Sequence, residues 1–144
     1  MNNALSALLR YVKDSELGFK AVEVYHNQFK ISKTDLKIIE VSGALPNCLA
    51  VVGQCKPVAA PPRFEFDLFI TTQSDSFQSD VNVDSNIKLV SELTAYIETN
   101  NTFEEEIDEE LREYNIDLES VSVTPFMVND KYAIYLIHIA FELL

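Results

Sequence analysis

Seven acidic residues lie between positions 104 and 113 of this 144-residue sequence, and they are its densest group of ionisable side chains. Carboxylates can hold a divalent cation or act as a general acid/base pair when they point into a cleft and burial raises the pKa of one of them. The run lacks the Asp-x-Asp-x-Asp-Gly spacing of a calcium loop. Its members are Glu104, Glu105, Glu106, Asp108, Glu109, Glu110 and Glu113.

Apolar residues recur at every fourth position within the acidic run, at Phe103, Ile107 and Leu111. Together with a capping-box pattern at Thr102 and Glu105, this spacing predicts a short helix with most of its acids turned to solvent. We therefore interpret the run as a solvated face. The main alternative is a face on which basic residues of a partner dock.

Histidine and cysteine add little chemistry to the sequence. His26 and His138 are the only histidines, and no cysteine lies at a metal-ligand spacing from either, so we expect no metal site. His138 lies in an apolar segment and is expected to be a hydrogen-bonded strand residue. Cys48 and Cys55 would lie about 23 Å apart on one strand, at roughly 3.3 Å per residue, which is too far for a disulfide.

The sequence motifs of nucleophilic catalysis and of phosphate binding are missing. No serine lies in a Gly-x-Ser-x-Gly elbow, and neither cysteine has a histidine close to it in sequence. Gly18, Gly43 and Gly53 are isolated from one another, so they form neither a phosphate-binding loop nor a dinucleotide fingerprint. We therefore expect no cofactor and no enzymatic activity.

The net charge of -12 is distributed unevenly along the chain. Residues 1–40 contain six basic and five acidic side chains, whereas residues 41–144 contain five basic and eighteen acidic ones. Such a surface repels nucleic acids and anionic membranes, so we expect no direct binding to either. Two readings remain open: the acids serve solubility and control of assembly, or they mask a basic partner surface.

Hydrophobic periodicity predicts two main helices. Leu5, Leu8, Leu9 and Val12 form a narrow apolar stripe of helical spacing near the N-terminus. A second helix is predicted after a polar loop at residues 73–84, with Asp84 or Ser85 as its cap. Its inner stripe is expected to consist of Ile87, Val90, Leu93 and Ile97.

Strands are predicted at residues 19–26, 47–54 and 63–72. In residues 30–45 the apolar residues follow neither the helical nor the strand period, so this segment is expected to be irregular or a short strand. Residues 118–128 and 131–143 are expected to pair as a hairpin with its turn at Asn129-Asp130. The last strand is apolar on both faces, which indicates a central strand covered on each side.

We thus predict one α+β domain over residues 1–144. It is expected to contain a mostly antiparallel sheet of about four to five strands and two main helices. The predicted order of elements is α-β-β-β-α-α-β-β, in which the short second helix of the pair is the acidic run.

Several of these segments resemble those of tail-terminator, or tail-completion, proteins of long-tailed phages, including the Mu-like group. The similar segments are the amphipathic N-terminal helix, Leu45–Val52, Phe64–Ile70, the helix around residues 87–97 and the long final strand. The resemblance implies a structural protein without catalytic residues. It also implies a hexameric ring that caps the tail tube and joins it to the neck.

In that role the partners would be other copies of the chain and the tail-tube and neck proteins. The protein would occupy the cytoplasm of the bacterial host and then the virion tail. The alternative suggested by the charge is an acidic binding module, such as a toxin-immunity protein or a DNA mimic, that masks a basic surface.

Overall fold

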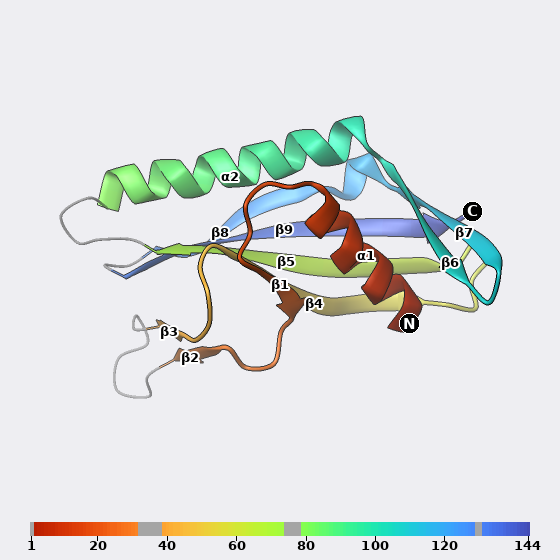
Figure 1. Ribbon diagram of the computed structural model, residues 1–144, viewed down its shortest axis with the longest axis horizontal. Helices are drawn as coiled ribbons and strands as arrows, with labels where there is room; N and C mark the ends of the chain where they lie inside the picture. The colour runs from red at the N-terminus through yellow and green to blue at the C-terminus, as the bar shows by residue number, and fades with distance from the viewer. Residues whose placement is uncertain (1, 32–38, 74–78, 129–130) are drawn as a thin grey trace.

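The computed structural model describes residues 2–31, 39–73, 79–128 and 131–144 (Figure 1). Within them the chain forms two helices, nine strands and one short 3-10 turn, which confirms the α+β class. In chain order these are α1 (Asn2–Asp14), β1 (Ala21–Val24), β2 (Phe29–Ile31), β3 (Ile39–Val41), β4 (Asn47–Lys56), β5 (Arg63–Gln73), α2 (Ser79–Thr99), β6 (Thr102–Ile107), β7 (Glu110–Ile116), η1 (Leu118–Ser120), β8 (Ser122–Val128) and β9 (Tyr132–Leu143).

The main sheet has seven strands, so the predicted count of four to five was too low. Its order is β1-β4-β5-β9-β7-β6, and β8 also pairs with β9. Only the β1–β4 pair is parallel. The strands β2 and β3 form a separate antiparallel pair. They lie largely in the segment 30–45, where the sequence indicated neither a helical nor a strand periodicity.

The long final strand β9 is central, as predicted. It pairs with β5 along the whole length of β5, from Arg63 opposite Glu142 to Gln73 opposite Tyr132. Its other edge is shared, because β8 pairs with residues 133–138 and β7 with residues 141–143. The predicted pairing of the last two strands is therefore confirmed, although β8 begins at Ser122 and residues 118–120 form η1; the turn at Asn129-Asp130 lies outside the described residues.

The two faces of the sheet are covered differently. On one face the alternating apolar residues of β5 and β9 pack beneath α2, which contacts both strands. At one end of the other face, Tyr25, Phe29, Phe69 and Phe126 form an aromatic cluster, with ring centroids 5.0–6.5 Å apart. This cluster joins the small β2–β3 sheet to the main sheet.

The sequence correctly predicted α2 as a helix, but it did not predict where the helix begins or every residue on its buried side. It begins at Ser79, so Asp84 and Ser85 lie inside it and do not cap it. Val90, Leu93 and Ile97 are buried as expected, but Ile87 is 44% exposed and Asn86 is fully buried. The Asn86 side-chain amide donates hydrogen bonds to the carbonyls of Ile70 and Ala133, so a polar residue ties the helix to both central strands.

The stripe of α1 is also rotated relative to the prediction. Its buried residues are Ala4, Ala7, Leu8, Tyr11 and Val12, while Leu5 and Leu9 are only partly buried. The Tyr11 hydroxyl donates a 2.7 Å hydrogen bond to the carbonyl of Asn100, just after α2. Burial raises the pKa of this hydroxyl, which keeps it protonated as a donor.

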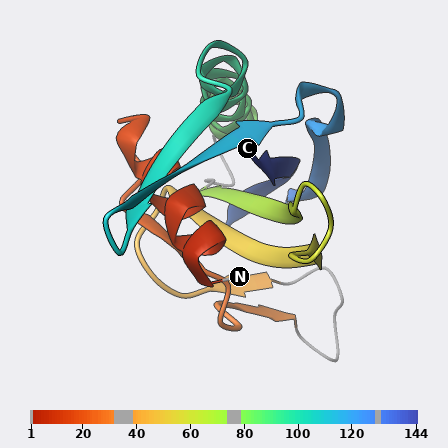
Figure 2. The same cartoon turned by 90° about the vertical axis from the view of Figure 1, so that its right-hand side faces the viewer.

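The predicted acidic helix is wrong, because residues 102–116 form the β6–β7 hairpin. Its turn is Asp108-Glu109, with φ of 50° and 66°, a left-handed pair typical of tight hairpins. Inward-facing Phe103 stacks on Tyr114 of the paired strand at 5.1 Å. Burial of these rings against Phe141 favours strand alternation over the helical spacing of the apolar residues. In Figure 2 the hairpin crosses the end of α1, which contacts β6.

The turn gives a test that separates a hairpin from a helix. We expect Glu109→Gly to raise the free energy of unfolding by about 0.5–1 kcal/mol, because glycine relieves the cost of a positive φ. In a helix the same change would lower it by a similar amount. Urea denaturation measures the difference. The control Glu113→Gly, within β7, should be destabilising, and a destabilising Glu109→Gly would contradict the turn.

Candidate functional site

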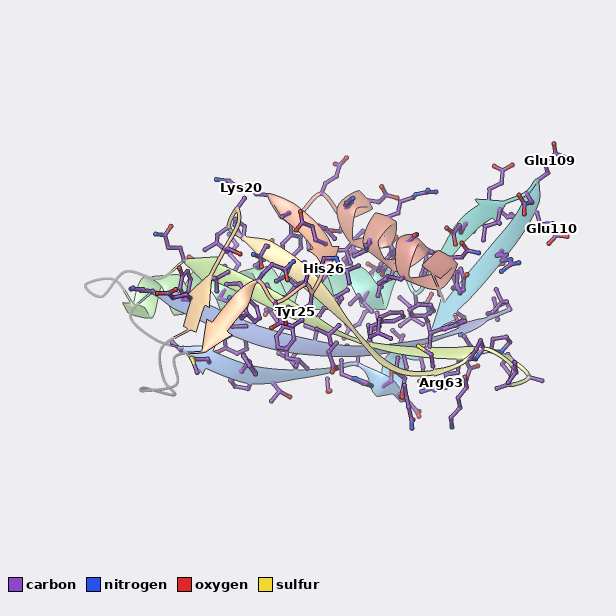
Figure 3. The ribbon with its side chains drawn as sticks, turned by 90° about the horizontal axis from the view of Figure 1, so that it is seen from below. Lys20, Tyr25, His26, Arg63, Glu109 and Glu110 are labelled. Atoms are coloured by element: carbon purple, nitrogen blue, oxygen red, sulfur yellow. The ribbon has the colours of Figure 1, made fainter. Side chains whose placement is uncertain are left out.

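The acidic hairpin, defined as β6, β7 and their turn, presents six exposed carboxylates: Glu104, Glu106, Asp108, Glu109, Glu110 and Glu113. Figure 3 shows Glu109 and Glu110 at its tip, pointing away from the body of the protein. Glu104 lies directly opposite Glu113 across the two strands. Because like charges opposite one another are destabilising, this face is suited to counter-ions or to basic side chains of a partner.

Glu105 does not belong to that exposed face, which corrects the predicted set of seven docking residues. Its side chain is on the inward side of β6, is only 8% exposed and lies opposite Arg112. Burial raises the pKa of its carboxyl, and the charges of Arg10 and Arg112 partly offset this increase. Glu110, opposite Ile107, is on the same side of the hairpin as Glu105 but is exposed at the tip, so Glu105 is the one buried acid of the run.

A second charged cluster lies on the sheet face opposite α2, at the Arg63 end of β5. The Arg63 guanidinium lies 3.0 Å from the Glu142 carboxylate and 3.1 Å from that of Asp117. The His138 Nδ1 atom lies 2.9 Å from Asp67 Oδ1, and its Nε2 atom lies 3.7 Å from Glu65. His138 is therefore a hydrogen-bonded strand residue, as predicted.

This cluster is better suited to holding strands together than to catalysis. Its charged side chains are between 25% and 38% exposed on an open sheet face. Arg63 connects β5 to β9 and to Asp117 at the start of η1. Within the described part of the chain, no three His, Cys, Asp or Glu side chains are arranged as metal ligands. Both cysteines are free thiols, which confirms the predicted lack of a disulfide.

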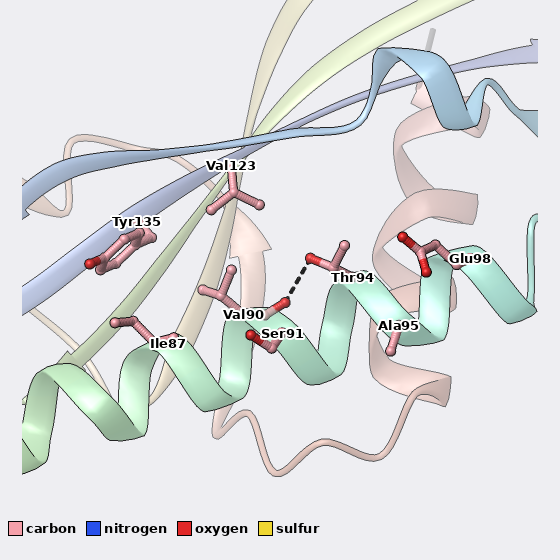
Figure 4. A pocket seen from close by; sticks show the side chains of 8 residues that line it. All are labelled: Ile87, Val90, Ser91, Thr94, Ala95, Glu98, Val123 and Tyr135. Carbon is pink, nitrogen blue, oxygen red and sulfur yellow. Dashed lines mark hydrogen bonds between the residues drawn. The ribbon is translucent and has the colours of Figure 1, made fainter.

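A third surface is a groove of about 360 Å³ between α2 and β8 (Figure 4). Its walls are mostly apolar or small, and the only charged lining residue is Glu98. The hydroxyl of Thr94 donates a 2.8 Å hydrogen bond to the Val90 carbonyl, so this polar group is satisfied within the helix. The lining residues are Ile87, Val90, Ser91, Thr94, Ala95, Glu98, Val123 and Tyr135.

The strand beside this groove is an edge with unusual exposure. Among the described strands, β8 pairs with β9 alone. Val123, Phe126 and Val128 are 43–45% exposed on it, and no charged residue occurs between positions 121 and 128. Phe126 belongs to the aromatic cluster on the other sheet face, so Ile87, Val123 and Val128 are the three of the nine exposed large hydrophobic residues in the described chain that lie here. We call this region, β8 with the groove, the α2–β8 surface.

The α2–β8 surface was not singled out from the sequence. Its signal was present but weak: an uncharged strand of seven residues in a chain with a net charge of -12. Periodicity alone cannot show that such a strand lies at an edge, because edge position depends on the order of the strands.

The sequence matches no protein-family model, and no curated protein matches it. Neither helix in the described ranges is sufficiently long and apolar to cross a membrane. The three surfaces described above are therefore the candidates for function.

Glu105 provides a pH test of the inward orientation. Because the folded state favours the protonated carboxyl, the free energy of unfolding should fall as pH rises from 4.5, the ordinary pKa, through the raised pKa of the folded protein. Glutamine does not ionise. We therefore expect Glu105→Gln to be more stable than the native protein at pH 7, with an advantage that shrinks as the pH falls below 4.5.

Thermal unfolding between pH 4 and pH 8 measures this effect. The matched control is Glu106→Gln, which neutralises the exposed neighbouring acid and should change little with pH. Equal curves for Glu105→Gln and the native protein would contradict the buried position of Glu105.

Proposed function

We propose that this protein is a non-enzymatic structural component of a phage or prophage tail. It forms a ring that caps the tail tube and joins it to the neck. Its partners are further copies of itself and the tail-tube and neck proteins, and it binds neither membranes nor nucleic acids directly. It passes from the cytoplasm of the bacterial host into the virion tail.

The main support for an assembly role is the α2–β8 surface. An edge strand with exposed apolar side chains and no charge is a ready site for association, and proteins that remain monomeric usually block such edges. The charged cluster around Arg63 and His138 lies on an open face and holds strands together, which favours a structural role over a catalytic one. The resemblance to tail-terminator proteins supplies the particular assembly.

The state of assembly tests the proposal. A chain of 16.3 kDa should form a species of about 98 kDa, six times that mass, as its concentration rises. Light scattering after size exclusion measures the mass, and negative-stain images should show rings. Purified tail tubes should be capped at one end after mixing. A chain that remains at 16.3 kDa and leaves tail tubes uncapped would contradict the proposal.

The acidic hairpin favours a second candidate, an acidic binding module that masks a basic partner surface. Six exposed carboxylates on one projecting hairpin concentrate negative potential in one place. If this face docks a basic partner, the position of the charges must matter as well as their number.

Charge reversal at two different sets of acids separates the effect of where the charges lie from the effect of the net charge. We expect lysine at positions 104, 106, 109 and 110 to weaken binding to a polylysine probe by on the order of tenfold more than a control with the same net charge. The control carries the changes Asp14→Lys, Glu40→Lys, Glu92→Lys and Glu119→Lys, at four exposed acids elsewhere. Calorimetric titration at fixed salt gives both affinities. Equal losses would show that total charge alone matters.

A further inference from the structure

The edges of the main sheet differ in how well they are protected. The strand β6 carries Glu104 and Glu106, whose charges discourage pairing with another acidic chain. The strand β8 has no charge, although Pro125 lacks an N–H and the register shifts between Pro125 and Met127. Backbone pairing at β8 is therefore confined to short stretches, and side-chain burial in the groove must provide most of any contact.

The opposite end of the sheet is a second weakly protected edge. The strand β1 pairs with β4 only as far as Ala50, so beyond that residue no described strand pairs with the edge of β4 that faces away from β5. Val52 is 41% exposed on this part of β4, which is similar to the exposure of Val123 on β8. We call residues 51–56 of β4, together with β1, the β1–β4 edge.

The residues that flank these two edges are opposite in charge, although β1 itself carries the exposed acid Glu23. Lys20 precedes β1 and Lys56 ends β4, and both are exposed. Glu98 lies at the groove and Glu119 lies in η1 just before β8, and both are exposed as well. A contact between two α2–β8 surfaces would bring acids against acids, whereas a contact with the β1–β4 edge brings lysines near them.

From this arrangement we infer that the α2–β8 surface of one copy binds the β1–β4 edge of a second copy. The two surfaces lie at opposite ends of the strand order β1-β4-β5-β9-β8, so the contact is head-to-tail. A head-to-tail contact repeats from copy to copy and closes into a ring when the rotation permits. The inference rests on the proposed function for the ring, and it adds which surfaces meet.

Two valine substitutions test the two sides separately. Val123→Lys places a charge in the α2–β8 surface, and Val52→Lys places one on the β1–β4 edge. Each variant alone should lose assembly and remain at 16.3 kDa, because a desolvated charge is costly in an apolar contact. Val58→Lys is the matched control, since Val58 is 97% exposed in the turn between β4 and β5, and it should assemble like the native chain.

Mixing the two variants distinguishes head-to-tail contact from contact between like surfaces. Each variant keeps one intact surface, so an equal mixture should form a complex of about 33 kDa, twice the chain mass, and grow no further. Contact between two α2–β8 surfaces would instead let Val52→Lys pair with itself, so that variant alone would form the 33 kDa species. Ile87→Lys, on the opposite wall of the groove, should replace Val123→Lys in the mixture with the same result. Circular dichroism confirms that each variant is folded.

The outcomes separate this inference from the proposed function. If the native chain forms rings and both Val52→Lys and Val123→Lys still form them, the surfaces are wrong while the ring proposal stands. If both variants lose assembly but their mixture remains monomeric, head-to-tail contact is wrong. If the native chain neither assembles nor caps tail tubes, the proposed function and the inference both fail.

Discussion

The structure depends on β9, a strand of twelve residues that is apolar on both faces and must be paired on both edges. Burying such a strand needs a partner along each edge and a layer over each face. The strand β5 supplies one whole edge, and α2 covers one face. One end of the opposite face is covered by the aromatic cluster that links β2 to the main sheet. The other elements are arranged around these requirements.

The second edge of β9 explains why the protein has two distinct outer surfaces. It is divided between two strands, because β7 takes residues 141–143 and β8 takes residues 133–138. The strand β7 continues into the acidic hairpin, which turns toward α1, while β8 remains beside α2 with its outer edge uncovered by any described strand. One shared edge thus produces both the acidic projection and the uncharged α2–β8 surface.

The sequence was sufficient wherever a segment had one strong periodicity. Phe64, Phe66, Leu68 and Ile70 alternate strictly, and β5 lies where this alternation predicts it. The acidic run was misassigned because its apolar residues recur every four positions and because buried Glu105 hides the alternation of β6. A carboxylate at an inward position is rare enough that pattern reasoning assigns it to solvent.

The errors in which side of each helix faces the core had a different cause, which is tertiary contact. Asn86 takes the inward position expected for Ile87 because its amide can satisfy two strand carbonyls, and no helical pattern encodes those carbonyls. Ile87 is left on the wall of the groove as a result. Of the surfaces discussed, the acidic hairpin was visible in the sequence as a charge run. The α2–β8 surface was not, because it depends on strand order and on the rotation of α2.

Electrostatics then decides how an acidic chain can meet its own copies. Two unit charges 10 Å apart in water repel by about 0.4 kcal/mol before screening, and physiological salt screens beyond a length of about 8 Å. Repulsion between acidic hairpins is therefore weak at a distance and strong only when the hairpins approach closely. It excludes contacts through β6 and leaves the uncharged β8 and the lysine-flanked β1–β4 edge. In the proposed assembly, the acids outside the contact thus select the geometry of association.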